Sequence, residues 1–166
     1  MKNLILINVF ILLLFTISEA QLQKGDKIPN FKIPSDTGEI IEFKKLKGKW
    51  IILYFYPKDN AAGCTKQIKT YSKLIRKFHK YNAEVFGINM DSIESHRNFK
   101  NKYRLYLKLL SDTKGELLHA FGIRIIEGFC TRDTVIINKK GKIEKIYSGI
   151  NPDGDPKEIL EYIKKN

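Results

Sequence analysis

The chain has 166 residues, of which 43% are hydrophobic and 29% are charged. This balance is typical of one compact globular domain and excludes a disordered or collagen-like chain. Lys and Arg outnumber Asp and Glu by 30 to 18, for a formal net charge of +12, but the basic residues are dispersed and accompany no recognisable nucleic-acid motif. We therefore expect a generally basic surface and no specific nucleic-acid partner. Two cysteines and three histidines also leave almost no room for a structural zinc cluster.

Residues 1–20 are predicted to be a cleaved secretory signal peptide. Lys2 gives a basic start, 4–15 is apolar except for one Asn, and Ala20 ends a stretch of small residues. The alternative is an uncleaved anchor, but about a dozen apolar residues fall short of the ~20 that span a bilayer. We expect a single mature domain at 21–166 without stable membrane insertion, exported to a periplasm, the exterior, or a secretory-pathway lumen or organelle.

The first half of the mature chain predicts three strands and a long helix. Short strands are expected at 31–33 and 40–43, around a turn. The aromatic and β-branched run at 50–56 is typical of a central strand buried on both faces. Apolar residues at helical spacing then predict a helix over about 64–81.

The second half continues the alternation of strands and helices. A strand is expected at 85–90, followed by a helix that Asp91 caps, with Glu94 completing a capping box. The remaining predicted elements are a strand at 107–110, a short helix at 115–121, a hairpin of strands at 133–138 and 142–148, and a final helix at 155–164. This order predicts a three-layer α/β sandwich around a mixed sheet.

Cys64 stands where a buried strand, a loop and a helix meet. The strand ends before Pro57, and the cysteine falls in the first turn of the following helix. Unpaired N–H groups and the positive end of the helix dipole favour a thiolate there, and reactive cysteines occupy such places. A buried structural thiol or half of a disulfide is the alternative, but the position favours a functional cysteine.

The segment FYPKDNAAGCTKQI resembles the active-site loop of the peroxiredoxins, and most of all their bacterioferritin-comigratory-protein or Q-type branch. The resemblance continues in order through GDKIPNF, GINMDS, LSD and RDTVII, and so covers nearly the whole mature chain. It implies a thioredoxin-like fold and reduction of peroxides by a cysteine thiolate. No metal, flavin or other cofactor is expected.

The resemblance also implies the roles of particular residues. Cys64 matches the peroxidatic nucleophile, which attacks hydrogen peroxide or an alkyl hydroperoxide and becomes a sulfenic acid. Arg132 matches the arginine that holds the thiolate and the peroxide oxygen, and Pro57 matches the proline that shields the pocket from water. A thioredoxin-like protein or a low-molecular-weight thiol would then reduce Cys64, and the branch implies a monomer or a weak dimer.

Two positions depart from the family pattern. Ala61 stands where the family has Thr or Ser, whose hydroxyl contacts the peroxide and the thiolate, and Gln67 stands where the branch commonly has Glu. We therefore expect slower turnover or a different choice of peroxide. A catalytically weakened binding, sensor or chaperone-like protein on the same fold is the alternative, although the retention of Pro57, Cys64 and Arg132 favours an enzyme.

The chain lacks the usual resolving cysteines of the branch. Position 69 is Lys, the helix expected before residue 104 has no cysteine, and Cys130 is the one other thiol of the sequence. Cys130 is a resolving cysteine, a permanent disulfide partner of Cys64, or a bystander; turnover by Cys64 alone is slightly favoured. In an extended stretch, Cys130 and Arg132 would share one face. Position 67 is not Cys, so the C-x-x-C motif of a thioredoxin-type oxidoreductase is absent, and His79, His96 and His119 are expected to have no metal or catalytic role.

Overall fold

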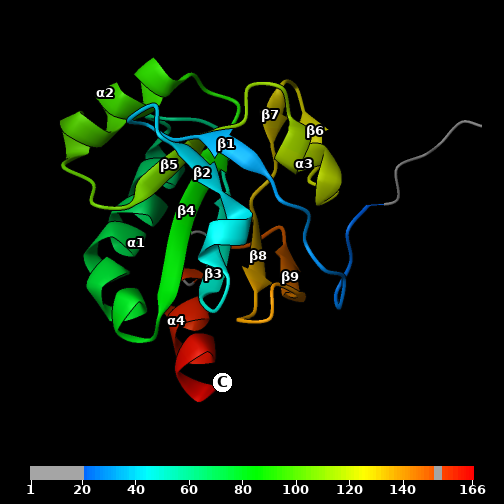
Figure 1. Ribbon diagram of the computed structural model, residues 1–166. Helices are drawn as coiled ribbons and strands as arrows, with labels where there is room; N and C mark the ends of the chain where they lie inside the picture. The colour runs from blue at the N-terminus through cyan, green and yellow to red at the C-terminus, as the bar shows by residue number, and fades with distance from the viewer. Residues whose placement is uncertain (1–20, 152–154) are drawn as a thin grey trace, which may run out of the picture.

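The computed structural model describes residues 21–151 and 155–166, which fold around a five-stranded mixed sheet (Figure 1). Its strands run in the order β5-β4-β3-β8-β9. The three strands that are parallel to one another are β3 (Trp50–Phe55), β4 (Ala83–Asn89) and β5 (Lys108–Ser111). The hairpin of β8 (Asp133–Ile137) and β9 (Ile143–Ser148) joins the sheet antiparallel to β3. The predicted α/β sandwich around a mixed sheet is confirmed.

The central strand β3 is buried on both faces because every residue of its run is apolar or aromatic. Its even-numbered residues face a hydrophobic cluster, here called the helical-face cluster, which includes Trp50, Ile52, Tyr54, Ile68, Tyr71, Ile159 and Leu160. Its odd-numbered residues face a second one, here called the opposite-face cluster, which includes Ile51, Leu53, Phe55, Leu117, Phe121 and Val135. The alternation of a strand therefore divides the interior into two cores.

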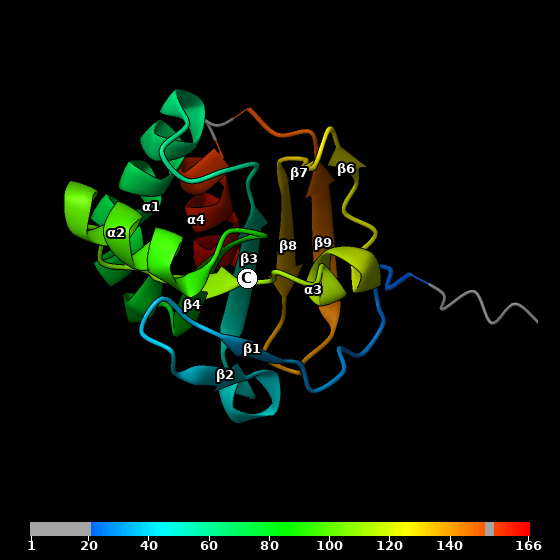
Figure 2. The ribbon, with the colours of Figure 1, turned by 90° about the horizontal axis from the view of Figure 1, so that it is seen from above.

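Helices cover the helical-face cluster. Figure 2 shows α1 (Ala62–Lys80) and α4 (Asp155–Lys165) side by side there. The helix α2 (Ile93–Tyr103) adds Phe99 to the same cluster. The opposite-face cluster is closed by shorter elements, which are β1 (Lys32–Pro34), β2 (Ile40–Glu42), a 3₁₀ turn (Phe43–Leu46) and α3 (Glu116–Ala120).

Two local predictions were wrong, and one element was missed. Phe43 does not end a strand but opens the 3₁₀ turn. Ser92, not Asp91, caps α2 by accepting from the N–H of Ser95, so Glu94 forms no capping box with Asp91. A small hairpin of β6 (Ile125–Ile126) and β7 (Phe129–Cys130) was not predicted, because strands of two residues show no periodicity.

The proposed signal peptide lies outside the described residues. Within 21–151 and 155–166, no helix has both the length and the apolar character that crossing a membrane requires.

Candidate active site

Cys64 lies in the first turn of α1, as the sequence predicts, and its side chain is 1% exposed. Nη2 of Arg132 lies 3.1 Å from Cys64 Sγ and donates a hydrogen bond to it. Gly63 leaves room for this approach, because a Cβ there would lie 3.3 Å from the same nitrogen. The guanidinium can therefore stabilise a thiolate, and it can also stabilise negative charge that develops on an attacked ligand.

The other arm of Arg132 is held by Gln67. Nη1 donates to Gln67 Oε1 at 3.0 Å, and Gln67 lies three residues beyond Cys64 on α1. Residues three apart lie on one side of a helix, so the thiol and the amide oxygen present two acceptors to one guanidinium. The planar fork of arginine suits such a two-point contact. The structure thus brings Cys64, Gln67 and Arg132 together.

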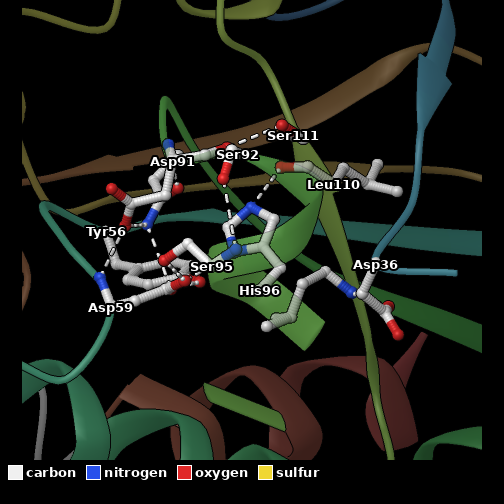
Figure 3. Close-up of polar contacts among 11 residues, drawn as sticks. Asp36, Tyr56, Asp59, Asp91, Ser92, Ser95, His96, Leu110 and Ser111 are labelled. Atoms are coloured by element: carbon white, nitrogen blue, oxygen red, sulfur yellow. Dashed lines mark hydrogen bonds and ion pairs between the residues drawn. The ribbon is translucent and has the colours of Figure 1, made fainter. Parts of the chain in front are cut away.

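The loop that carries Pro57 is anchored by a buried carboxylate (Figure 3). Asp59 accepts hydrogen bonds from Tyr56 Oη at 2.7 Å, Ser95 Oγ at 2.8 Å and His96 Nδ1 at 2.9 Å. Its backbone N–H donates to Asp91 at 2.8 Å. These contacts tie the chain just before Cys64 to α2 and to the end of β4.

The fully buried His96 is the partner of Asp59. Nδ1 of His96 faces Asp59, and Nε2 faces the carbonyl oxygen of Leu110 at 3.2 Å (Figure 3). Each ring nitrogen thus faces an oxygen atom, so His96 links the loop at Asp59 to β5. Burial raises the pKa of Asp59, but the hydrogen bond and charge of His96, with the two hydroxyls, outweigh it and hold that pKa below its ordinary value.

Asp59 and His96 were not recognised from the sequence. His96 was expected to be an ordinary surface or core residue, and it is fully buried. The signal that could have found the pair is the position of each residue, because Asp59 lies in the loop that follows the buried strand β3 and His96 lies one turn into a helix. Pro57 opens the loop as a half-buried residue, and its shielding role stays a prediction.

Cys130 lies apart from the Cys64–Arg132 pair. It belongs to the opposite-face cluster, whereas Cys64 belongs to the helical-face cluster. The stretch from Cys130 to Arg132 is not one continuous strand, since β7 ends at Cys130 and β8 begins at Asp133, and the two side chains contact different groups, the Tyr56 carbonyl and the Cys64 thiol. Both cysteines are free thiols.

The Cys130 thiol is also engaged and protonated. Its Sγ donates to the carbonyl oxygen of Tyr56 at 3.0 Å. Burial, with the charges of Asp133 and Cys64, raises the pKa of the Cys130 thiol to about 12. Since the thiolate is the form that attacks, this environment makes Cys130 a poor nucleophile at neutral pH.

No group of three or more His, Cys, Asp or Glu side chains that could hold a metal ion occurs within residues 21–151 and 155–166. The described site itself presents a buried thiol held against a guanidinium.

Known proteins share this sequence and fold. The AhpC/TSA family profile matches residues 24–146. A putative peroxiredoxin bcp of Coxiella burnetii is 34% identical over 146 residues, which cover 84% of this chain and 97% of that protein. A chloroplastic peroxiredoxin Q of Triticum aestivum is 35% identical over 147 residues, 87% of this chain and 68% of that protein.

A solved structure agrees with these relatives. A PrxQ mutant of Xylella fastidiosa superposes with a TM-score of 0.83 at 26% identity, and the match covers 88% of this chain and 98% of that one. The thioredoxin-like fold implied by the sequence is thereby confirmed. Profile, relatives and fold together show that this chain belongs to the AhpC/TSA family, among the peroxiredoxins of the bcp and Q type.

Proposed function

We propose that the chain is a thiol peroxidase that reduces hydrogen peroxide and alkyl hydroperoxides through Cys64. The observation that carries the proposal is the 3.1 Å contact between Arg132 Nη2 and Cys64 Sγ. The thiolate attacks the terminal oxygen of the hydroperoxide and the O–O bond breaks. Cys64 keeps the attacked oxygen as a sulfenic acid, and the leaving oxygen takes up a proton as water or an alcohol. Arg132 stabilises the charge on the sulfur and on the leaving oxygen.

An external thiol recycles Cys64 in this proposal. A thiolate of a thioredoxin-like protein or of a low-molecular-weight thiol attacks the sulfenic sulfur, forms a mixed disulfide and releases water. A second thiol then reduces that disulfide and frees Cys64. The state of Cys130 supports this route, because a thiol with a pKa of about 12 supplies almost no thiolate at neutral pH.

The intact mass of the reduced protein after one equivalent of hydrogen peroxide tests whether Cys64 forms a sulfenic acid and whether Cys130 then captures it. A sulfenic-acid trap that labels Cys64, and labels nothing in Cys64→Ser, is the expected result. Loss of two hydrogens without an adduct would make Cys130 the resolving cysteine. A chain that stays unoxidised would overturn the peroxidase and favour the weakened binding, sensor or chaperone-like protein that the missing hydroxyl at Ala61 otherwise fits.

Export and assembly are proposed on the sequence alone. The basic start, apolar run and small residues of 1–20 support a cleaved signal peptide and an exported chain at 21–166. N-terminal sequencing of the exported protein should begin at Gln21, and recovery of an intact Met1 in membranes would contradict it. Sedimentation of the same material should show a monomer or a weak dimer.

A further inference from the structure

Asp155, the first residue of α4, is a buried carboxylate close to the Cys64–Arg132 pair. It is 1% exposed. Its Oδ2 accepts from Tyr71 Oη at 2.6 Å, from Gln67 Nε2 at 2.9 Å and from Thr134 Oγ1 at 3.4 Å. Donors from α1 and β8 therefore converge on one oxygen atom of the C-terminal helix.

The bond from Gln67 has a consequence for Arg132. A Gln side chain ends in one donor group and one acceptor. Because Nε2 of Gln67 faces Asp155, its Oε1 must face the other way, and there it accepts from Arg132 Nη1 at 3.0 Å. With the amide reversed, an N–H group would point at the guanidinium. The carboxylate thus selects the amide orientation in which Gln67 can hold Arg132.

We propose that Asp155 is a positioning residue for the Cys64 chemistry, which orients Gln67 and through it holds Arg132 against the thiol. This inference rests on the proposed peroxidase function and adds to it a residue from the far end of the chain. The carboxylate that orients this arrangement belongs to α4, and the neutral Gln67 side chain links it to Arg132.

The Asp155 carboxylate is costly to bury. Burial raises the pKa of Asp155, and its three donors offset that rise only in part. Its second oxygen, Oδ1, is buried without a hydrogen-bond partner among the described residues, which is a costly arrangement. The titratable groups near the carboxylate are Tyr71 on α1, Tyr54 on β3 and Glu158 on α4 itself, and Arg132 is the cation that Gln67 links to it.

Asp155→Asn tests the proposal directly, since it removes the charge and keeps the shape. We expect the rate constant of Cys64 with hydrogen peroxide to fall roughly 10- to 100-fold, the effect of misplacing a reacting group by about 1 Å. The pH at which half of Cys64 is alkylated by iodoacetamide should rise, because Arg132 no longer stabilises the thiolate. A fall in that pH would mean that Asp155 acts only as a nearby negative charge, and would overturn the proposal.

Asp112→Asn is the matched control. Asp112 is also buried, its pKa is also raised by burial, and it accepts from the N–H groups of Glu116 and Leu118 at the start of α3. Its removal costs stability in the other core, so the peroxide rate constant and the alkylation profile of the folded variant should match those of the wild type.

If Asp155→Asn does not fold, Gln67→Glu and the double variant Gln67→Glu/Asp155→Asn test the same contact. Gln67→Glu places a second carboxylate within hydrogen-bond distance of Asp155, and two such groups cannot both ionise freely. We expect its peroxide rate constant to fall as the pH rises and the shared proton is lost. Gln67→Glu combined with Asp155→Asn should restore the wild-type rate and profile, since the amide introduced at position 155 then donates where Gln67 did. A Gln67→Glu profile like that of the wild type would contradict the proposal.

Failure of the proposed function is distinguishable from failure of this inference. A wild-type chain that consumes no peroxide would refute the peroxidase, yet the alkylation profiles of the same variants would still report whether Asp155 governs the state of Cys64. Normal peroxide consumption with unchanged profiles would refute the inference alone.

Discussion

At the scale of single residues, Ala61 leaves the start of α1 without a side-chain cap. It is the N-cap of α1, and its methyl group makes no cap hydrogen bond to the first N–H groups of the helix. Its backbone is extended, with φ −65° and ψ 138°, which Ser and Thr also adopt at caps. The Thr or Ser hydroxyl expected at this position from the family pattern would thus serve both the proposed peroxide site and the cap of α1.

Ala61→Thr is therefore expected to have two effects. The new hydroxyl should cap α1 and raise the free energy of unfolding by about 0.5–2 kcal/mol. It should also add a hydrogen-bond donor near the thiolate and raise the peroxide rate constant. Urea unfolding and rapid kinetics measure the two effects. Ala62→Thr, one residue inside the helix, should gain neither, and an Ala61→Thr rate equal to the wild type would discard the catalytic part.

The buried Asp59–His96 pair gives a second prediction at this scale. His96→Leu leaves Asp59 as an unpaired buried charge, which should cost about 3–5 kcal/mol of unfolding free energy. His79→Gln is the control, because His79 is exposed and lies 3.6 Å from a surface Glu, a pair worth about 0–1 kcal/mol.

The same pair predicts the sign of the pH dependence. The pKa of Asp59 is lower in the folded chain than the ~3.9 of an unfolded Asp. Its contribution to stability is therefore fully present above that unfolded value and is lost as the pH falls toward the lower folded pKa. Urea midpoints between about pH 5 and pH 2 should fall less steeply for His96→Leu than for the wild type; an equal slope would show that His96 does not set the ionisation of Asp59.

At the scale of elements, the β6–β7 hairpin is fastened to the loop that precedes Cys64. Cys130 donates to the Tyr56 carbonyl at the end of β3, and Lys58 Nζ lies 5.5 Å above the ring of Phe129. The Cys130 thiol thus serves as a hydrogen-bond donor that joins the hairpin to this loop.

Cys130→Ser keeps that donor and should show what the sulfur contributes. We expect the peroxide rate constant and turnover with an external thiol to stay unchanged, because the hydroxyl can bond the same carbonyl. A variant that forms the sulfenic acid but no longer turns over would instead identify Cys130 as the resolving residue.

The sequence predicts those elements that have a strong internal period. The strand β3 and the apolar stripe of α1 follow from their own residues, and the place of Cys64 follows from both. The cap of α2 does not, because Asp91 is drawn to Asn89 and the N–H of Asp59, which leaves Ser92 as the cap. Nor does Asp155, whose contact with Gln67 joins residues 88 positions apart.

At the scale of the whole molecule, the proposed site draws on only one of the two cores. Cys64, Gln67 and Tyr71 come from α1, and Asp155 comes from α4, which packs beside it. Arg132 reaches Cys64 from the segment between β7 and β8, outside the helices that carry these groups. A cavity in the helical-face cluster should therefore slow the peroxide reaction more than a cavity in the opposite-face cluster.

Ile159→Ala and Ile143→Ala test that difference. Both residues are buried, Ile159 in the helical-face cluster and Ile143 in the opposite-face cluster, and each truncation should cost about 2–5 kcal/mol. Under conditions where both variants are folded, Ile159→Ala should also slow the peroxide reaction, because α4 carries Asp155, and Ile143→Ala should not. Equal rates would show that α4 tolerates the cavity without moving its first residue.

The division between Cys64 and Cys130 also governs what excess oxidant would do. A sulfenic acid with no neighbouring thiol to capture it waits for an outside reductant, and a second peroxide that arrives first converts it to sulfinic acid. In the proposed chemistry, the balance of thiol and peroxide in the surroundings decides between renewal and permanent loss. Each molecule would then keep a lasting chemical record of the oxidant dose it met, because in this proposal no second cysteine of the chain captures the sulfenic acid.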